Sequence, residues 1–419
     1  MFQVKMFFLL IFFMCLLNAS EQLQISRSID NVNRIPDSQK LTVDFIMKYG
    51  YPGEMHEIQT KDGYILTLHR IPHNGTNLKA NRPVVLLQHG IVLSSDQWVL
   101  RGTQDLVFQL SKQGYDVWMS NTRGTPYSRH IYYTMNDYKF WDYSLDELGN
   151  IDLPAIIDYV LQVTKKPHLT YVGHSRGVAM AVILLSSQPE YNSKINLFAG
   201  IAPVIYSKEA KCIIYEFAGN RPNAIMRVST LQEIFRKGKV RNVLSTTKTT
   251  RLMINSLCKT SPILQNLCLS MSFFINGEDF QMFNKSLMPM MLSHFTLGVG
   301  GKELIHLLQI SESDVFRPFD YGRQLNIKYY GKTVPEPYNL TKITTPVFLY
   351  YGPNDFFVSE RDLFKFAREL PNFIGYYKIP YNKFNHIDYI FANNANDLFF
   401  PHIIHLLNLY NNEEKYFIQ

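Results

Sequence analysis

The stretch HLTYVGHSRGVAMAVILL, residues 168–185, decides the fold of this chain of 419 residues. Leu169, Tyr171 and Val172 are typical of a short buried strand, and the end of the stretch is typical of a small, apolar helix that stops at Pro189. Between strand and helix lies GHSRG, a G-x-S-x-G motif. This order produces a strained turn that exposes a serine hydroxyl, and the glycines leave room where strand and helix cross. We therefore predict that Ser175 is a nucleophile.

A serine hydroxyl becomes a strong nucleophile only when a histidine removes its proton and a carboxylate orients that histidine. In an α/β-hydrolase these partners follow the serine in the order Asp, then His. Asp355 follows the apolar run 347–351, which is typical of a late strand, and His386 follows a second such run at 374–379. The stretch between them has room for one helix and one strand. The predicted triad is Ser175, Asp355 and His386.

Four further residues compete for the acid and base roles: Asp388, Asp397, His402 and His405. The two histidines lie in HIIHLLNLY, a helical pattern in which histidine is usually a packed or surface residue. Asp388 is too close to His386 in the sequence to come from a separate strand. These alternatives are weaker than the predicted triad.

Acyl transfer also requires N–H donors for the oxyanion of the tetrahedral intermediate. The residue after the nucleophile supplies one backbone N–H, so we assign this donor to Arg176. The second donor comes from the loop after an early strand, here residues 83–88, and Gly90 in that loop permits a turn that aims the Ile91 N–H inward. We predict that Ile91 and Arg176 form the oxyanion hole.

The chain resembles the acid lipase family, the group that includes gastric lipase, lysosomal acid lipase and insect-type lipases. The resemblance covers nearly the whole mature chain. Besides the serine motif, it rests on YGYPGEMHEIQTKDGYILTLHRIP (49–72), LLQHGIVLSSDQW (86–98), SNTRGTPYSRHIYY (120–133), FWDYSLDELGNIDLPAIIDYV (140–160), YYGPND (350–355) and FNHIDYIFA (384–392). It implies an α/β-hydrolase fold with a mostly parallel central sheet. It also places the family's nucleophile, acid and base at Ser175, Asp355 and His386, and its oxyanion donors at Ile91 and Arg176.

One position departs from the family pattern. The family motif usually reads GHSQG, whereas this chain has arginine at position 176. The change keeps the backbone donor, because every residue except proline has an N–H. A guanidinium that faced the site would lower the pKa of His386 by disfavouring the imidazolium.

The chain begins with features of an exported protein. The apolar run MFFLLIFFMCLL, residues 6–17, is too short to span a bilayer and has the length of a signal-peptide core, so we predict a signal peptide at 1–20. No second run is long and apolar enough to be a membrane helix, which predicts a secreted or lysosomal protein without a transmembrane anchor. Three N-x-S/T sequons predict glycosylation at Asn74, Asn284 and Asn339.

Cysteine and charge usage narrow the class further. The family resemblance implies a disulfide between Cys258 and Cys268, with Cys212 outside it. The net charge of +7 is spread along the chain, and the one basic cluster, residues 236–239, is typical of a solvated face rather than a nucleic-acid site. No phosphate-binding glycine loop and no metal-spaced His/Cys cluster occurs in the sequence, so we expect neither cofactor nor metal.

A long insertion divides the hydrolase pattern. Residues 205–330 lose the alternation of strands and helices and become helical and rich in Met and Phe, whereas 21–204 and 331–419 form the expected core. A segment of this kind forms a helical cap, or lid, whose apolar inner face lines an acyl pocket and meets a lipid surface when it moves.

These features together predict a lipase that hydrolyses carboxylic esters of neutral lipids, either triacylglycerol or steryl ester, through an acyl-enzyme. The expected partner is a neutral lipid or lipid-droplet interface. Two alternatives remain: a carboxylesterase for small soluble esters, and a lipid-binding protein without turnover. The complete triad argues against the binding protein, which has no need of all three side chains.

Overall fold

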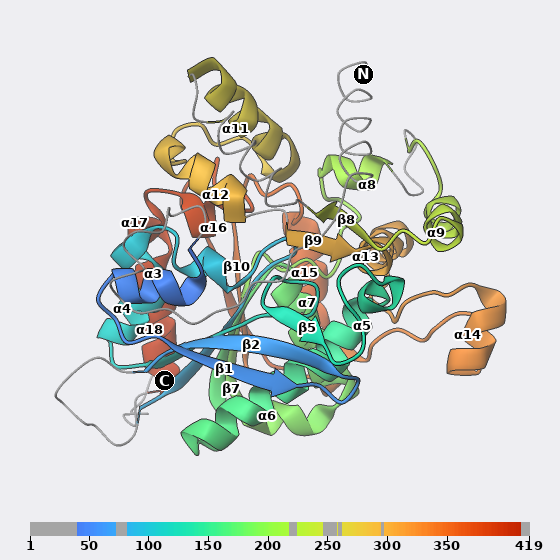
Figure 1. The fold of residues 1–419 in the computed structure, drawn as a ribbon, viewed down its shortest axis with the longest axis horizontal. Helices are drawn as coiled ribbons and strands as arrows, with labels where there is room; N and C mark the ends of the chain where they lie inside the picture. The colour runs from blue at the N-terminus through green and yellow to red at the C-terminus, as the bar shows by residue number, and fades with distance from the viewer. Residues whose placement is uncertain are drawn as a thin grey trace.

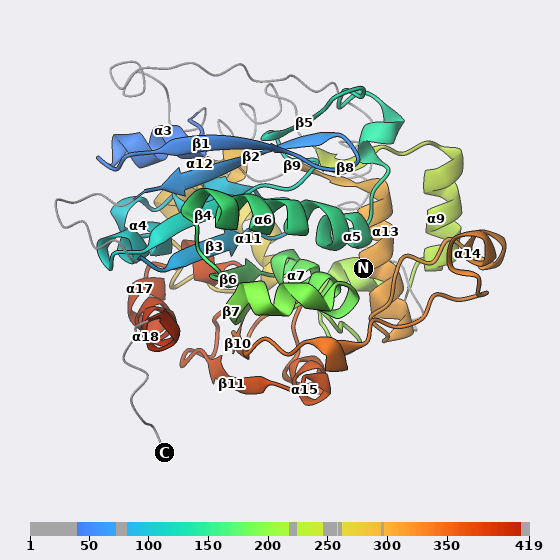
Figure 2. The same ribbon diagram turned by 90° about the horizontal axis from the view of Figure 1, so that it is seen from below.

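A mostly parallel sheet forms the centre of the computed structural model, which describes residues 40–72, 82–217, 224–245, 258, 262–294 and 297–411. Along the sheet the strands lie in the order β1 (Glu54–Gln59), β2 (Tyr64–Ile71), β4 (Asp116–Ser120), β3 (Val84–Gln88), β6 (Leu169–His174), β7 (Ile195–Ile201), β10 (Val347–Tyr351) and β11 (Phe373–Lys378). Figure 2 shows this order from β1 at one side to β11 at the other. The short strand β5 (Ser128–His130) pairs with β2.

From β4 to β11 neighbouring strands of this sheet run parallel, whereas β2 pairs antiparallel with β1, β4 and β5. The central strands β3, β4 and β6 are buried along their whole length, because helices cover both faces of a parallel sheet. The helices of the hydrolase core are α3 (Thr42–Lys48), α4 (Leu106–Lys112), α5 (Leu145–Glu147), α6 (Leu153–Thr164), α7 (Arg176–Ser187), α15 (Glu360–Glu369), α16 (Asp388–Phe391), α17 (Ala395–Leu398) and α18 (Phe400–Asn411). The predicted α/β-hydrolase architecture is confirmed.

A buried ion-pair network is centred on Arg123, which lies in the sequence block at residues 120–133. The Arg123 guanidinium, 2% exposed, donates to Asp152 at 2.6 Å and to Asp62 at 2.7 Å. It also lies over the Tyr64 ring, 4.0 Å from its centroid. The network fixes the loop after β4 to the start of α6, next to the sheet edge that carries the site.

The segment between β7 and β10 contains α8 (Ile213–Phe217), α9 (Val228–Lys237), α11 (Pro262–Asn276), α12 (Met288–His294), α13 (Gly301–Ser313) and α14 (Arg323–Tyr330). Figure 1 shows α11 and α12 at the top of the molecule, with α8, α9 and α13 to the right of them and α14 at the far right. The segment is not exclusively helical, because β8 (Asn242–Ser245) and β9 (Leu297–Gly300) pair as an antiparallel sheet. Two four-residue strands so far apart in the sequence leave no detectable alternation.

The insertion packs in two ways. A small cluster of its own joins α8, α9 and α13 through buried residues such as Tyr215, Leu231 and Ile305. In contrast, Leu269, Phe273 and other apolar side chains of α11 and α12 belong to the main core. The part of the insertion formed by α11 and α12 is therefore continuous with the hydrolase core. No helix among the described residues is long and apolar enough to cross a membrane.

Candidate active site

Ser175 lies at the turn between β6 and α7, in a strained backbone conformation. Its φ of 54° and ψ of −113° are rare for a residue with a side chain. The Ser175 N–H donates to the Ile201 carbonyl at 2.8 Å, and the Ser175 carbonyl accepts from the Val178 N–H at 2.9 Å. These bonds hold the turn, so that the hydroxyl stands at the carboxyl end of β6.

Neither glycine of the motif leaves room for a side chain. A Cβ at Gly173 would lie 2.8 Å from the backbone of Gly177, and a Cβ at Gly177 would lie 2.8 Å from the Gln88 carbonyl oxygen. Strand β6, helix α7 and strand β3 therefore approach one another more closely than any side chain would permit. The sequence argument for these glycines holds in the structure.

Asp355 lies on the loop after β10, with its carboxylate fixed by the backbone. One oxygen, Oδ1, accepts hydrogen bonds from the N–H groups of Phe357 at 2.8 Å and Val358 at 3.1 Å. The second oxygen, Oδ2, lies 2.8 Å from Nδ1 of His386. Because both oxygens have hydrogen-bond partners, the carboxylate is held in one orientation, with Oδ2 facing the imidazole.

His386 lies after β11 and contacts both other members of the predicted triad. Its Nε2 is 2.9 Å from the Ser175 hydroxyl oxygen, while Nδ1 faces Asp355. All three side chains are buried, and the Phe357 ring packs on the imidazole with ring centroids 4.6 Å apart. The structure thus brings together three residues that are widely separated in the sequence. Their arrangement permits Nε2 to take the serine proton while Asp355 orients the ring.

A second histidine supports this arrangement and was missed by the sequence analysis. His174, next to the serine, donates from Nε2 to the carbonyl oxygen of His386 at 3.2 Å. Burial and the neighbouring His386 lower the pKa of His174 to about 3, so its ring is neutral at physiological pH. The position of His174 inside the GHSRG motif could have drawn attention to this residue. The motif does not, however, predict its hydrogen bond to the His386 carbonyl.

The competing residues lie elsewhere or have other partners. His402 contacts the Tyr350 hydroxyl from α18, and His405 is exposed on the same helix. Asp397 is exposed in α17. Asp388 accepts a hydrogen bond from the Asn385 N–H at 2.7 Å, and burial raises its pKa well above the usual range. None of the four contacts Ser175.

A turn of the insertion holds the acid and base loops together, which the sequence analysis did not foresee. The carbonyl oxygen of Asn276 accepts from the N–H groups of His386 at 3.3 Å and Phe356 at 3.4 Å. The next two carbonyls, of Gly277 and Glu278, accept from the side-chain amides of Asn385 and Asn354, each at 2.9 Å. This turn, residues 276–279, therefore contacts both loops that carry the predicted triad.

The proposed oxyanion loop follows β3. Gly90 is needed for space rather than for a left-handed backbone, because a Cβ there would lie 3.0 Å from the His174 ring. The left-handed residue of the loop is Val92, with a φ of 55°. Ile91 lies between them, and Arg176 is the first residue of α7, where backbone N–H groups have no acceptor within the helix.

The Arg176 side chain does not contact the triad. It is buried and pairs with Glu303 on α13, with Nη1 and Oε1 2.9 Å apart. Glu303 was also missed, since no local pattern connects two residues 127 positions apart.

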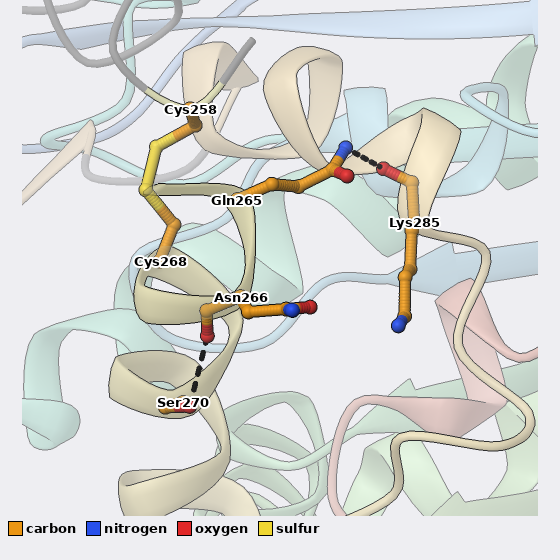
Figure 3. Close-up of a disulfide and its surroundings, with 6 residues drawn as sticks. All are labelled: Cys258, Gln265, Asn266, Cys268, Ser270 and Lys285. Atoms are coloured by element: carbon orange, nitrogen blue, oxygen red, sulfur yellow. Dashed lines mark hydrogen bonds between the residues drawn. A yellow bond between two sulfur atoms is a disulfide. The ribbon is translucent and has the colours of Figure 1, made fainter. Parts of the chain in front are cut away.

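The disulfide implied by the family resemblance is present between Cys258 and Cys268 (Figure 3). It joins Cys258 to α11, and Gln265 of the same helix donates to the Lys285 carbonyl at 3.0 Å. Cys212 is buried in the small cluster of the insertion.

Two of the predicted glycosylation sites are among the described residues. Asn339 is exposed and Asn284 is half-buried, and each begins a short 3-10 helix. In both sequons the asparagine oxygen accepts hydrogen bonds from the backbone N–H and hydroxyl of the residue two positions later. Asn74 and the predicted signal peptide lie outside the described residues.

Known proteins resemble this chain over most of its length. Residues 42–102 match the family described as a partial alpha/beta-hydrolase lipase region, and residues 83–217 match the alpha/beta hydrolase fold. Lipase 1 of Drosophila melanogaster is 36% identical, over 89% of this chain and 81% of that protein. Gastric triacylglycerol lipase of Homo sapiens is 32% identical, over 89% and 93% of the two chains. The chain belongs to the acid lipase family.

A solved structure agrees with this family at the level of the fold. A putative lipase from Sulfolobus solfataricus has a TM-score of 0.51 and 14% identity, and the match covers 85% of this chain and 99% of that one. As a member of the acid lipase family with an α/β-hydrolase fold, the protein is a carboxylic ester hydrolase.

Proposed function

We propose that this acid lipase hydrolyses neutral-lipid esters, triacylglycerol or steryl ester, with Ser175, His386 and Asp355 as its triad. The observation that carries the proposal is the continuous contact from Asp355 through both nitrogens of His386 to the Ser175 hydroxyl, at 2.8 and 2.9 Å. The strained serine turn and the family relationship support it.

The proposed reaction has two halves. The Ser175 oxygen forms a bond to the acyl carbon while its proton passes to Nε2 of His386, and the oxyanion is held by the N–H groups of Ile91 and Arg176. Collapse of this intermediate breaks the bond to the alcohol, which leaves with the proton from His386. Water then attacks the acyl-enzyme by the same route in reverse and releases the fatty acid.

The first experiment tests the triad with matched controls. Ser175→Ala and His386→Ala should each reduce kcat roughly 10⁴- to 10⁶-fold on a soluble short-chain ester, and combining them should add little. The controls are Ser186→Ala on α7, the helix that follows Ser175, together with Asp397→Asn and His405→Ala, and each should keep kcat within threefold. An active Ser175→Ala enzyme, or an inactive His405→Ala enzyme, would contradict the assignment.

We further propose that residues 205–330 act as a cap over an acyl-chain site and respond to a lipid surface. The packing of the Met- and Phe-rich helices α11 and α12 against the main core supports this placement. Activity on a long-chain ester should then rise steeply once the substrate exceeds its solubility and forms droplets. A smooth saturation curve through that limit would favour the alternative, an esterase for small soluble esters.

The site of action is proposed to be the extracellular space or the lysosomal lumen. The apolar run 6–17, the disulfide and the sequons support this route. Expression in cultured cells tests it: the mature chain should begin near residue 21 and shift in mass when N-glycans are removed. A cytosolic, unglycosylated chain that retains residues 1–20 would contradict it.

A further inference from the structure

Two buried carboxyl groups meet where the insertion contacts the loop of His386, and the proposed triad uses neither of them. Asp279 ends the turn at residues 276–279, and Asp388 begins α16, two residues after His386. Neither side chain is exposed to solvent, and no cation among the described residues forms an ion pair with either. Because an ionised carboxylate is costly to bury alone, two of them side by side require another way to reduce their charge.

Hydrogen bonds around the two carboxyl groups connect the insertion to the core. Asn385 donates from its backbone N–H to Asp388 Oδ2 at 2.7 Å, and from its side chain to the Gly277 carbonyl at 2.9 Å. The side chains of Asp279 and Asp388 are themselves in hydrogen-bonding contact. The turn of the insertion and the loop before α16 therefore meet at this pair.

One oxygen of each carboxyl group has no donor. Asp279 Oδ2 and Asp388 Oδ1 are buried, and no N–H or hydroxyl group of the described residues donates to either oxygen. If both groups were ionised, these oxygens would have no hydrogen-bond partner, and the two charges would repel each other. A single proton between them gives both oxygens a partner, because a protonated carboxyl group donates and a carboxylate accepts.

The surrounding donors distinguish the anion from the acid. Asp279 Oδ1 accepts from the N–H groups of residues 281 and 282, each at 3.1 Å, and the Tyr381 hydroxyl lies 3.1 Å from the same oxygen. Asp388 has one N–H donor, at 2.7 Å. Since hydrogen bonds to a carboxylate favour its charged form, Asp279 is the better anion and Asp388 the better acid.

The titratable groups that face Asp388 favour the same assignment. Burial has the largest effect and raises the pKa of Asp388 well above its usual range, and the charges of Asp279 and Asp355 raise it further. A backbone hydrogen bond acts in the opposite direction. Burial also raises the pKa of Tyr381 to about 12 and that of Tyr389 well above its usual range, so both hydroxyl groups are neutral.

We propose that Asp388 and Asp279 share one proton across this junction and thereby position His386 for catalysis. The Asp388 Oδ1–H donates to Asp279 Oδ2 and holds the turn of the insertion, whose Asn276 carbonyl accepts from the His386 N–H at 3.3 Å. When the proton leaves for solvent, two buried carboxylates repel, which separates the turn from the loop and displaces the base. Asp388 and Asp279 are positioning residues, because they act through the loop and do not touch the reacting atoms. The proposal rests on the proposed function in one respect, the role of His386 as the base.

The raised pKa of Asp388 gives the sign of the pH dependence. In the unfolded chain this carboxyl group loses its proton near its ordinary pKa, whereas the folded protein keeps the proton to higher pH. The stabilisation of the junction is therefore complete below the ordinary pKa and is lost as the pH rises through the raised one. A general base that must be neutral to act loses activity on the acid side instead, so the two effects fall on opposite limbs of the profile.

Asp388→Asn tests the proposal, because its amide N–H replaces the acid O–H as a donor to Asp279 at every pH. On a soluble short-chain ester, kcat of the wild type should fall at least tenfold relative to that of Asp388→Asn between pH 5 and pH 9, because a misplacement of about 1 Å can cost about 10²-fold in rate. KM should change less than about threefold, since the contacts with substrate are kept. Asp388→Ala has no donor and should lose at least about tenfold in kcat already at pH 5.

Asp105→Asn is the matched control for the loss of a buried acid. Asp105 is also buried, and burial raises its pKa to about 8, but it lies beside Arg101 at the start of α4. This variant should keep the alkaline fall of the wild type. Superimposable profiles of the wild type and Asp388→Asn would overturn the proposal. So would an Asp388→Asn enzyme as impaired at pH 5 as Asp388→Ala, because the amide would then not replace the acid.

A second measurement detects the shared proton without turnover. The infrared C=O stretch of a protonated carboxyl group is separate from that of a carboxylate, and the difference spectrum between the wild type and Asp388→Asn isolates this residue. At pH 5 that spectrum should contain the protonated band, which should disappear over the pH range in which kcat falls. An ionised Asp388 at pH 5, as expected if a cation lay between the two oxygens, would contradict the proposal. Failure of the proposed function would show separately, as ester hydrolysis that survives Ser175→Ala.

Discussion

Gly277 offers a direct test of whether the insertion positions the triad. It lies in the turn at residues 276–279 with a φ of +109°, and a Cβ there would lie 2.0 Å from the carbonyl oxygen of Asn354 and 3.0 Å from the Asn385 Cβ. These two residues directly precede Asp355 and His386. Reaching an ordinary contact of about 3.4 Å requires a shift of roughly 1.4 Å, and a misplacement of about 1 Å can cost 10²-fold in rate. Gly277→Ala should therefore lower kcat/KM about 100-fold.

Gly331→Ala is the matched control. Gly331 also lies in the segment between β7 and β10, with a φ of +70°, but no atom lies within 4 Å of the added methyl group. Gly331→Ala should lose about 1–2 kcal/mol of unfolding free energy, because a Cβ is unfavourable in a left-handed conformation. Gly277→Ala should lose more than the control, because its Cβ also meets the carbonyl oxygen of Asn354. Only Gly277→Ala should lose activity. The assay is hydrolysis of a soluble short-chain ester, with urea unfolding in parallel, and equal kcat/KM values for the two variants would refute the reasoning.

Three further predictions concern stability. Arg123→Gln should cost about 3–5 kcal/mol in urea unfolding, because it leaves the buried Asp152 without its counter-charge, and a loss below 1 kcal/mol would contradict this. Burial lowers the pKa of His69 to about 4, so the stability from its neutral ring is complete above pH 6.5 and is lost as the pH falls toward 4. That loss amounts to about 3 kcal/mol, and His69→Gln should remove it from the pH dependence, whereas an unchanged slope between pH 7 and 4 would argue against it. Replacing Cys258 and Cys268 by serine opens a loop with a sequence separation of 10, which should cost about 2–3 kcal/mol, and an unchanged urea midpoint would contradict this estimate.

The main features of the fold and the composition of the site could be predicted because they follow from local pattern and chain order. Strands β6 and β10 are short apolar runs, and parallel strands bring their carboxyl ends to one edge of the sheet. Ser175 directly follows β6 and Asp355 lies on the loop after β10, so the order Ser, Asp, His was enough to select them. The glycines of the serine motif were predictable for the same reason, since the close crossing of strand and helix is a local requirement.

The contacts of the insertion could not be predicted, because nothing local specifies them. Asn276 and Gly277 form a recognisable turn dipeptide, but the sequence does not say that their carbonyls meet the loops of Asp355 and His386. For the same reason the direction of the Arg176 side chain was open. Its partner Glu303 has no distinctive local sequence pattern around it. Only the packing of α13 brings this carboxylate to Arg176.

These contacts limit how a cap can move. The insertion is fixed to the core by the turn at residues 276–279, by the Arg176–Glu303 pair, and by His294 of α12, whose Nδ1 lies 3.0 Å from Asp96 Oδ2. Lifting the whole insertion as a rigid body would break all three contacts. It would also release the acid and base loops at the moment when substrate enters. The proposed response to a lipid surface must therefore come from segments between these anchors, while the turn and the first part of α13 stay in place and the loops of Asp355 and His386 stay together.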